Sequence, residues 1–187
     1  MRNGFQAGPL IEGPDTALRE PEKSVLLDIL KEKSKEHHSV QMHWLNDAGE
    51  VVGIAATPGD ASFHATLWRN GVITDLGTLA GDCFSDTGAI NSNHQIVGAS
   101  FNCDTNTERV VLWDRGSIID LNTLIPANSS LELSDASNIN DRGEIAGRGL
   151  PPGCDDVHFC GHGFFLIPCD NATTCEDNTG VDFRNSE

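Results

Sequence analysis

The sequence predicts an all-β fold of repeated four-stranded antiparallel units, partly β-propeller-like, with one N-terminal helix. Three observations support this prediction. A turn followed by an apolar run occurs three times. A second block of residues recurs at the same spacing. The runs between them are short and rich in Val, Ile, Leu and Trp, which suit a half-buried pleated surface. The 187 residues are enough for one domain with a core.

The first repeated block is a polar turn that leads into an apolar strand. It reads Asn46-Asp47-Ala48-Gly49-Glu50-Val51-Val52-Gly53 and returns over 91–98 and 140–147, at spacings of 45 and 49 residues. Gly49 and Gly143 are expected to supply positive φ in these turns. We expect the shared positions to belong to the core of the repeat: Asn46, Asn91, Asn140, Gly53, Gly98 and Gly147.

The second repeated block contains a hairpin. Residues 64–79 match residues 109–124, and an incomplete third copy begins at His162. An Asn-Gly pair, Asn70-Gly71, separates two apolar runs and predicts a tight hairpin turn. Trp68 and Trp113 occupy matching positions and are expected to pack in the core or between units. Asp75 and Asp120 are expected to hydrogen-bond a neighbouring turn.

Each unit is expected to contain four short strands. In the second unit they are predicted over 87–91, 95–100, 109–113 and 117–121. Four antiparallel strands in this length are typical of a propeller blade, and propellers usually need about four or more blades to close. With about three copies, the chain is an open partial propeller, a compact stack of sheets, or a piece of a longer array.

The repeats divide the chain into three regions. Residues 1–40 do not repeat, and Pro21 followed by Leu26, Ile29 and Leu30 predicts a helix over about 20–37. This helix is expected to pack on the β domain or cap an edge, and the alternative is a partner-binding helix. Residues 41–170 form the β-repeat domain, and residues 171–187 are expected to be a flexible tail.

The charge narrows the class of partner. A net charge of −16 with only 12 Lys and Arg residues excludes a nucleic-acid binder, because phosphate contacts need clustered basic residues. The acidic excess fits a solvated surface and could attract cations. No apolar run approaches the ~20 residues of a membrane-spanning helix.

The cysteines predict an oxidising compartment. Six are present, and three local pairs are plausible among many connectivities: Cys83 with Cys103, Cys154 with Cys160, and Cys169 with Cys175. The first nine residues lack the apolar stretch of a signal peptide, which taken alone places the chain in the cytoplasm. We therefore expect an extracellular protein whose sequence is a mature or truncated form.

The repeated blocks resemble the HAF-repeat family, extracellular repeat proteins of bacteria. The resemblance covers roughly 42–170 and implies export and a repeat type, with no established chemistry. The motif His-Ala-Phe-Leu-Trp falls on His64, Ala65, Leu67 and Trp68, and Thr66 departs from its aromatic residue. Arg109 replaces the histidine in the second copy, where Leu112 and Trp113 are kept. In the third copy His162 is kept, Gly163 replaces the alanine, and Phe164 keeps the aromatic.

Two loops are candidate metal sites. Cys154, His158, Cys160 and His162 could ligate zinc, but their spacing lacks the usual Cys-x-x-Cys pair. A Cys154–Cys160 disulfide explains the same cysteines and is the favoured interpretation. Asp104, Asn106 and Glu108 offer the alternating oxygen ligands of a calcium loop without its central Gly, and an ordinary polar loop is the alternative.

No catalytic motif is present. The sequence lacks a Gly-x-Ser-x-Gly elbow, a phosphate loop and a dinucleotide fingerprint. We expect a secreted, non-catalytic module that binds an unidentified protein or glycan. It is expected to need no cofactor, although it could bind calcium. Two alternatives stay open: a polysaccharide hydrolase using Asp155 or Asp156, and a structural fragment completed by an oligomeric partner. Trp44 is expected to be either a core residue or an exposed stacking platform for a sugar.

Overall fold

The computed structural model describes residues 40–59, 61–126 and 129–168. The chain divides into two compact units, Met1–Glu36 and His37–Glu187, and the fold described below is that of the second. The predicted helix over 20–37, the tail over 171–187 and the Cys169–Cys175 pair lie outside the described residues. No helix of the described part is both long and apolar enough to cross a membrane.

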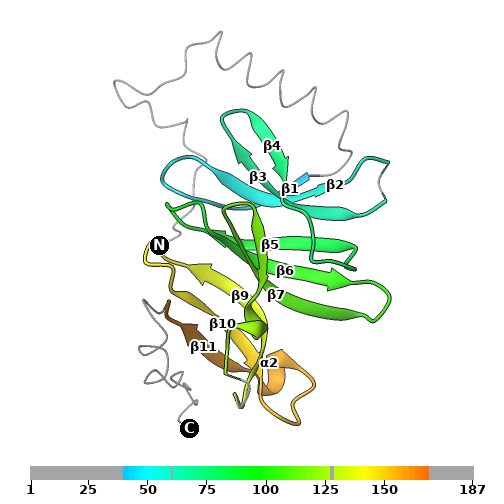
Figure 1. Ribbon diagram of the computed structural model, residues 1–187, viewed down its shortest axis with the longest axis vertical. Coiled ribbons are helices and arrows are strands. Elements are labelled where there is room, and N and C mark those ends of the chain that lie inside the picture. The colour runs from blue at the N-terminus through cyan, green and yellow to red at the C-terminus, as the bar shows by residue number, and fades with distance from the viewer. Residues whose placement is uncertain (1–39, 60, 127–128, 169–187) are drawn as a thin grey trace, which may run out of the picture. The chain divides into compact units, whose positions relative to one another are not determined.

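Strands dominate the described residues and form three antiparallel sheets (Figure 1). The first sheet contains β1 (Val40–Leu45), β2 (Val51–Ala56), β3 (Phe63–Arg69) and β4 (Val72–Asp75), in that order. The second repeats this order with β5 (Phe84–Ile90), β6 (Ile96–Asn102), β7 (Thr107–Asp114) and β8 (Ser117–Asp120). A short 3-10 turn, η1 (Leu121–Thr123), follows β8. The prediction of an all-β fold is confirmed.

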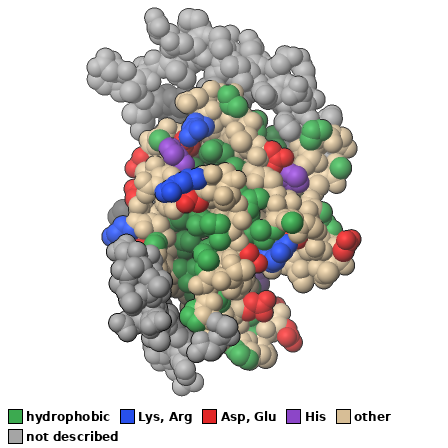
Figure 2. All heavy atoms as spheres, viewed as in Figure 1, with side chains coloured by type: hydrophobic (Ala, Val, Ile, Leu, Met, Phe, Trp, Pro, Cys, Tyr) green, Lys and Arg blue, Asp and Glu red, His purple; other side chains and the backbone are tan. Residues whose placement is uncertain are grey.

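The third sheet has three strands in the order β11-β10-β9. They are β9 (Glu132–Ile139), β10 (Ile145–Leu150) and β11 (His162–Leu166), and the four-residue helix α2 (Val157–Cys160) lies between the last two. Within the described residues, no strand pairing joins one sheet to another, and no sheet closes on itself. On the face viewed in Figure 2, acidic, basic and apolar side chains are interspersed.

Two apolar layers hold the three sheets together. Between the first and second sheets, Val52 and Ala65 pack in one cluster with Ile96, Val111 and Trp113. Trp113 is 4% exposed, and its indole Nε1 donates a hydrogen bond of 3.0 Å to the Leu76 carbonyl, which satisfies its buried polar group. Trp68 is partly buried. The layer between the second and third sheets includes Ala89, Val97, Val110, Leu133 and Phe164.

The asparagine that opens each turn is the main polar link between sheets. The Oδ1 atom of Asn91 accepts hydrogen bonds from the main-chain N–H groups of Asn93 (3.0 Å) and Gln95 (2.9 Å). Asn46 and Asn140 make the equivalent pairs within their own turns. The amide of Asn46 also donates to the Asn91 carbonyl (3.0 Å), and that of Asn91 to the Asn140 carbonyl (2.8 Å). The three turns are thereby stacked.

A glycine in each second strand accommodates a bulge in the first. The pairing slips by one residue at His43 in β1, Gly88 in β5 and Ser137 in β9. The bulged strand brings a main-chain carbonyl against the facing glycine, Gly53, Gly98 or Gly147, where any Cβ atom would collide with it. Only glycine fits at such a close backbone approach.

The predicted turns have the expected conformations. Asn70 and Gly71 have φ of 52° and 75°, as a two-residue hairpin turn requires, and Gly49 and Gly143 have φ of 75° and 76°. Two predicted disulfides are present, Cys83–Cys103 and Cys154–Cys160, with Cα–Cα distances of 5.9 and 5.7 Å. Asp75 and Asp120 accept hydrogen bonds from the main-chain N–H groups of Gly77 (2.7 Å) and Asn122 (2.9 Å), as predicted.

Candidate functional site

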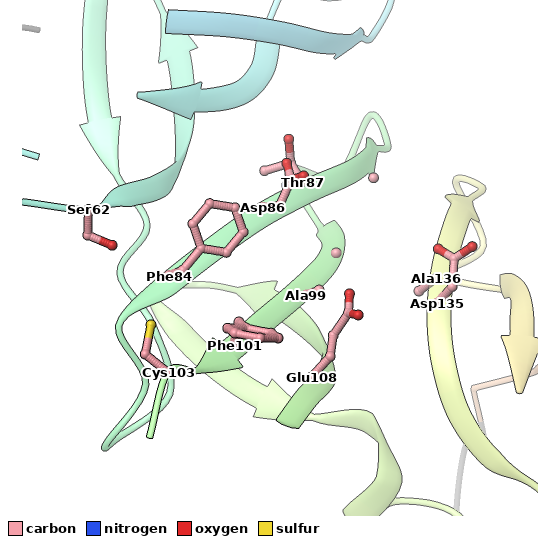
Figure 3. A pocket seen from close by; sticks show the side chains of 12 residues that line it. Ser62, Phe84, Asp86, Thr87, Ala99, Phe101, Cys103, Glu108, Asp135 and Ala136 are labelled. Carbon is pink, nitrogen blue, oxygen red and sulfur yellow. The ribbon is translucent and has the colours of Figure 1, made fainter. Parts of the chain in front are cut away.

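A groove of about 530 Å³ lies where the second sheet faces the third (Figure 3). The strands β5, β6 and β7 provide one wall and β9 provides the other. The loop between β2 and β3 closes one end through Ser62, whose hydroxyl donates to the Cys83 carbonyl. The groove is therefore lined by strands of the second and third sheets and by a loop of the first sheet.

Strand alternation places two phenylalanines and two carboxylates on one wall of the groove. Phe84 and Asp86 are two residues apart in β5 and share a face. Phe84 lies opposite Phe101 of β6, and Phe101 lies opposite Glu108 of β7. Figure 3 shows Glu108 beside Phe101, with Asp135 across the groove on the third sheet. The wall therefore combines aromatic surface with carboxylates.

Two of the three carboxylates in the groove have partners, and the third does not. Asp86 lies 2.9 Å from Nδ1 of His43 and accepts a hydrogen bond of 2.6 Å from the Thr87 N–H. Asp135 accepts a hydrogen bond of 2.7 Å from Nη2 of Arg148. Among the described residues, Glu108 makes neither a hydrogen bond nor an ion pair. Its negative charge is the uncompensated one.

The pKa of Glu108 is raised above its usual value of 4.5. Glu108 is an exposed residue of the groove, yet the surrounding protein displaces part of its hydration, and this is the largest cause. The negative charges of Asp135 and then Asp86 raise the pKa further. A positive charge placed among these three groups would relieve their repulsion.

The groove is rich in hydrogen-bond acceptors and poor in positive charge. No Lys or Arg is among the described residues that line it. Thr87, which also lines it, is 5% exposed, and its Oγ1 has no hydrogen-bond partner in the described part of the chain. Carboxylates accept hydrogen bonds from ammonium and hydroxyl groups, and the face of a Phe ring attracts cations. The arrangement can hold a cationic, hydroxyl-bearing molecule.

The candidate calcium residues are divided between a turn and the groove. Asp104 and Asn106 lie in the turn between β6 and β7, where the Asn102 side chain accepts a hydrogen bond of 3.0 Å from the Asp104 N–H. Glu108 lies in β7 and lines the groove instead. The described residues contain no group of three His, Cys, Asp or Glu side chains placed to hold a metal ion. Asp104 and Asn106 are exposed in this turn.

The candidate zinc residues surround a disulfide. Cys154 and Cys160 are bonded to each other, so neither sulfur is a free thiolate for a metal. Nδ1 of His158 lies 3.3 Å from Nη1 of Arg148, and His162 lies in β11. Asp156 accepts a hydrogen bond of 2.8 Å from the His158 N–H and so caps α2. Neither Asp155 nor Asp156 lines the groove.

Sequence reasoning missed the groove, although the sequence contains a signal for it. Asp86 and Asp135 are 49 residues apart, the same spacing as Asn91 and Asn140. Each follows a serine and lies five residues before the asparagine of its turn. Carboxylates at matching positions of neighbouring units predict two acids near each other on adjacent sheets. Trp44 is 50% exposed, so it is a surface residue and not a core residue.

No family model, curated protein or solved structure matches this chain.

Proposed function

We propose that this chain is a secreted, non-catalytic β-repeat module that binds an amine-bearing glycan in the groove between its second and third sheets. The unpartnered carboxylate of Glu108, beside Asp86 and Asp135 and next to two phenylalanines, is the observation that carries this proposal. An amino sugar offers ammonium and hydroxyl donors to the carboxylates and an apolar ring face to Phe84 and Phe101.

Export and the repeat are part of the same proposal. Two disulfides among the described residues favour an oxidising compartment. Three antiparallel sheets with stacked asparagine turns support a partial propeller, and the HAF-repeat resemblance supports the repeat type and export. Intact mass of the natively produced protein after alkylation tests the first point, and we expect no cysteine to be modified. Alkylated Cys83 or Cys154 would contradict export.

The binding experiment compares two hexasaccharides that differ in charge. We expect calorimetry to show binding of the glucosamine hexamer and much weaker binding of its N-acetylated counterpart, because acetylation removes the positive charge. Glu108→Gln should weaken binding about 10-fold or more, since one charged hydrogen bond is lost. The matched control is Asp104→Asn, which removes the same charge from an exposed turn residue that does not line the groove.

Three results would contradict the proposal. They are no binding of the glucosamine hexamer, equal binding of both hexamers, and equal weakening by Glu108→Gln and Asp104→Asn. A lysine hexapeptide serves as a third ligand. If it bound more tightly than the glucosamine hexamer, the ligand would be a basic protein segment instead of a glycan.

A second candidate function is hydrolysis of the same glycan. The raised pKa of Glu108 beside two other carboxylates is the observation that favours it, because a glycosidase acid must keep its proton near the working pH. Chromatography of the hexamer after incubation distinguishes the two functions. Cleavage that Glu108→Gln abolishes while binding persists would establish a hydrolase, and an intact hexamer supports the binding module. Asp156→Asn should change neither result, because Asp156 lies outside the groove.

A further inference from the structure

Arg148 in β10 compensates one of the three groove carboxylates from outside the groove. It lies directly opposite Asp135 of β9, and its Nε and Nη2 atoms donate hydrogen bonds of 3.1 and 2.7 Å to Oδ2 of Asp135. The hydroxyl of Ser137 donates to the same oxygen (3.1 Å). Arg148 is not among the residues that line the groove. The guanidinium group therefore offsets the charge of Asp135 without taking space in which a ligand would lie.

The fold does not require an arginine at this position. The second strand of each unit has a different residue after its bulge-facing glycine: Ile54, Ala99 and Arg148. The first and second strands pair around this position in all three sheets. In the second sheet Ala99 lies opposite Asp86, whose partner is His43 of the first sheet. An apolar residue is thus compatible with the same strand pairing, and Arg148 is specific to the third unit.

One carboxylate of the groove remains for a ligand. Asp86 is paired with His43 and Asp135 with Arg148, whereas Glu108 has no partner in the described part of the chain. A cation is stabilised most beside a carboxylate that no other group compensates. An ammonium group at Asp135 would instead lie near the Arg148 guanidinium, and like charges repel. The groove therefore offers one favourable place for an ammonium group.

We infer that Arg148 limits the groove to ligands that place one ammonium group in it, at Glu108. The inference rests on the proposed function and narrows its ligand class to a glycan with a single free amine among neutral sugars. Those neutral sugars need no carboxylate, and their ring faces pack on Phe84 and Phe101. Without Arg148, Asp135 becomes a second free carboxylate that favours a second ammonium group. Arg148 thus determines specificity without touching the ligand.

The matched variants are Arg148→Gln and Arg142→Gln. Both remove one positive charge from the β9–β10 hairpin, but Arg142 is paired with Glu144, outside the groove. Calorimetry compares the glucosamine hexamer with an N-acetylated hexamer that has a single free amine. In the wild type, this one amine should recover most of the affinity that full acetylation removes. In Arg148→Gln the ratio of the two affinities should shift about 5-fold towards the glucosamine hexamer, because a second ammonium group gains a partly exposed carboxylate.

Three controls define the role of Arg148. Arg142→Gln should leave the ratio of affinities unchanged, and Arg148→Lys, which keeps the charge, should restore the wild-type ratio. Arg148→Ala repeats the test with the residue that the second sheet already has at the matching position, Ala99. Thermal unfolding checks that each variant keeps the fold. A purely structural role of Arg148 would lower the stability and leave the ratio as it is in the wild type, which would overturn the inference.

A titration of Glu108 without ligand separates this inference from the proposed function. Carbon-detected NMR should show a higher pKa of Glu108 in Arg148→Gln than in Arg142→Gln, because the charge of Asp135 is then uncompensated. An equal pKa in the two variants would overturn the inference. If this difference occurred but the wild type bound neither hexamer, the proposed function would be wrong, and the control of the groove charge by Arg148 would stand.

Discussion

The side-chain amide of Asn91 donates a hydrogen bond of 2.8 Å to the main-chain carbonyl of Asn140, 49 residues further along the chain. The same amide also donates to Oε1 of Gln95 (2.8 Å), and the Asn91 Oδ1 atom accepts two main-chain N–H groups of its own turn. Asn91 is 3% exposed, so water cannot replace these partners. One side chain thus closes a turn and links the second sheet to the third.

Asn91→Ala should lower the free energy of unfolding more than Asn140→Ala does. The first change removes four part-buried hydrogen bonds made by a buried side chain and should cost about 2–4 kcal/mol. Asn140 is exposed, and in the described residues its amide donates to Glu144 alone, so its loss should cost about 1 kcal/mol. Urea denaturation of both variants measures the difference. Equal losses would show that the link between the turns contributes nothing to stability.

Gly98→Ala should be among the most destabilising single changes in the second sheet. A Cβ atom there would collide with the Asp86 carbonyl, so the bulge in β5 would have to move, at a cost of about 2–3 kcal/mol. Gly163→Ala in β11 is the control, because the nearest atom to its Cβ would be 4.0 Å away. Its effect should stay within about 0.5 kcal/mol. Similar thermal unfolding of the two variants would contradict the steric account.

Much of the second sheet could be predicted from local residues. The strands predicted over 109–113 and 117–121 correspond to β7 and β8 within two residues, because Asp114, Arg115 and Gly116 set the turn between them. The strand predicted from 87 begins at Phe84. No continuous apolar run marks this early start, because Ser85 and Asp86 are polar. Ser85 is nevertheless fully buried, and its hydroxyl binds main-chain groups of the first sheet and the following loop.

The repeat spacing relates Asp86 to Asp135, but the rest of the groove depends on contacts between sheets that the local sequence does not specify. Asp135 lies in a strand whose pairing slips twice, between Ala146 and Gly147 and again between Arg148 and Gly149. Each slip changes the face to which the following side chains point, and nothing in the local sequence marks the second slip. The zinc and disulfide interpretations of Cys154 and Cys160 differ only in the distance between two sulfurs, which the spacing of the residues does not determine.

Acid should destabilise the protein through two buried carboxylates. Burial alone would raise the pKa of Glu50, but hydrogen bonds from Asn46, His94 and Arg69 and the charge of His94 lower it below 4.5. Asp82 is similar: burial raises its pKa, but Ser100 and Arg109 lower it below 3.8. A lowered pKa in the folded state means that the ionised form stabilises the fold.

The stabilisation from these carboxylates should be complete above their ordinary pKa values. It should be lost as the pH falls below about 4 through the lowered values. In Glu50→Gln and in Asp82→Asn, the free energy of unfolding should fall less steeply with decreasing pH in that range than it does in the wild type. The measurement is the urea midpoint as a function of pH. Variants that lose stability with acid as steeply as the wild type would show that these carboxylates are not responsible.

Binding of the glucosamine hexamer should weaken as the pH falls, and through Glu108 it should do so at a higher pH than the one at which Glu50 and Asp82 take up protons. Because the pKa of Glu108 is raised, this carboxyl takes up a proton at a higher pH than an ordinary glutamate, whose pKa is 4.5. Affinity should therefore fall as the pH decreases through that raised value, when it is measured below the pKa of the sugar amines so that they stay protonated. In Glu108→Gln the affinity should be lower and nearly constant over the same range.

Since a bound ammonium group favours the ionised carboxylate, the hexamer should also lower the pKa of Glu108. Carbon-detected NMR of the labelled side chain measures this change. If wild-type affinity did not change over this range, Glu108 would not be the group that holds the amine.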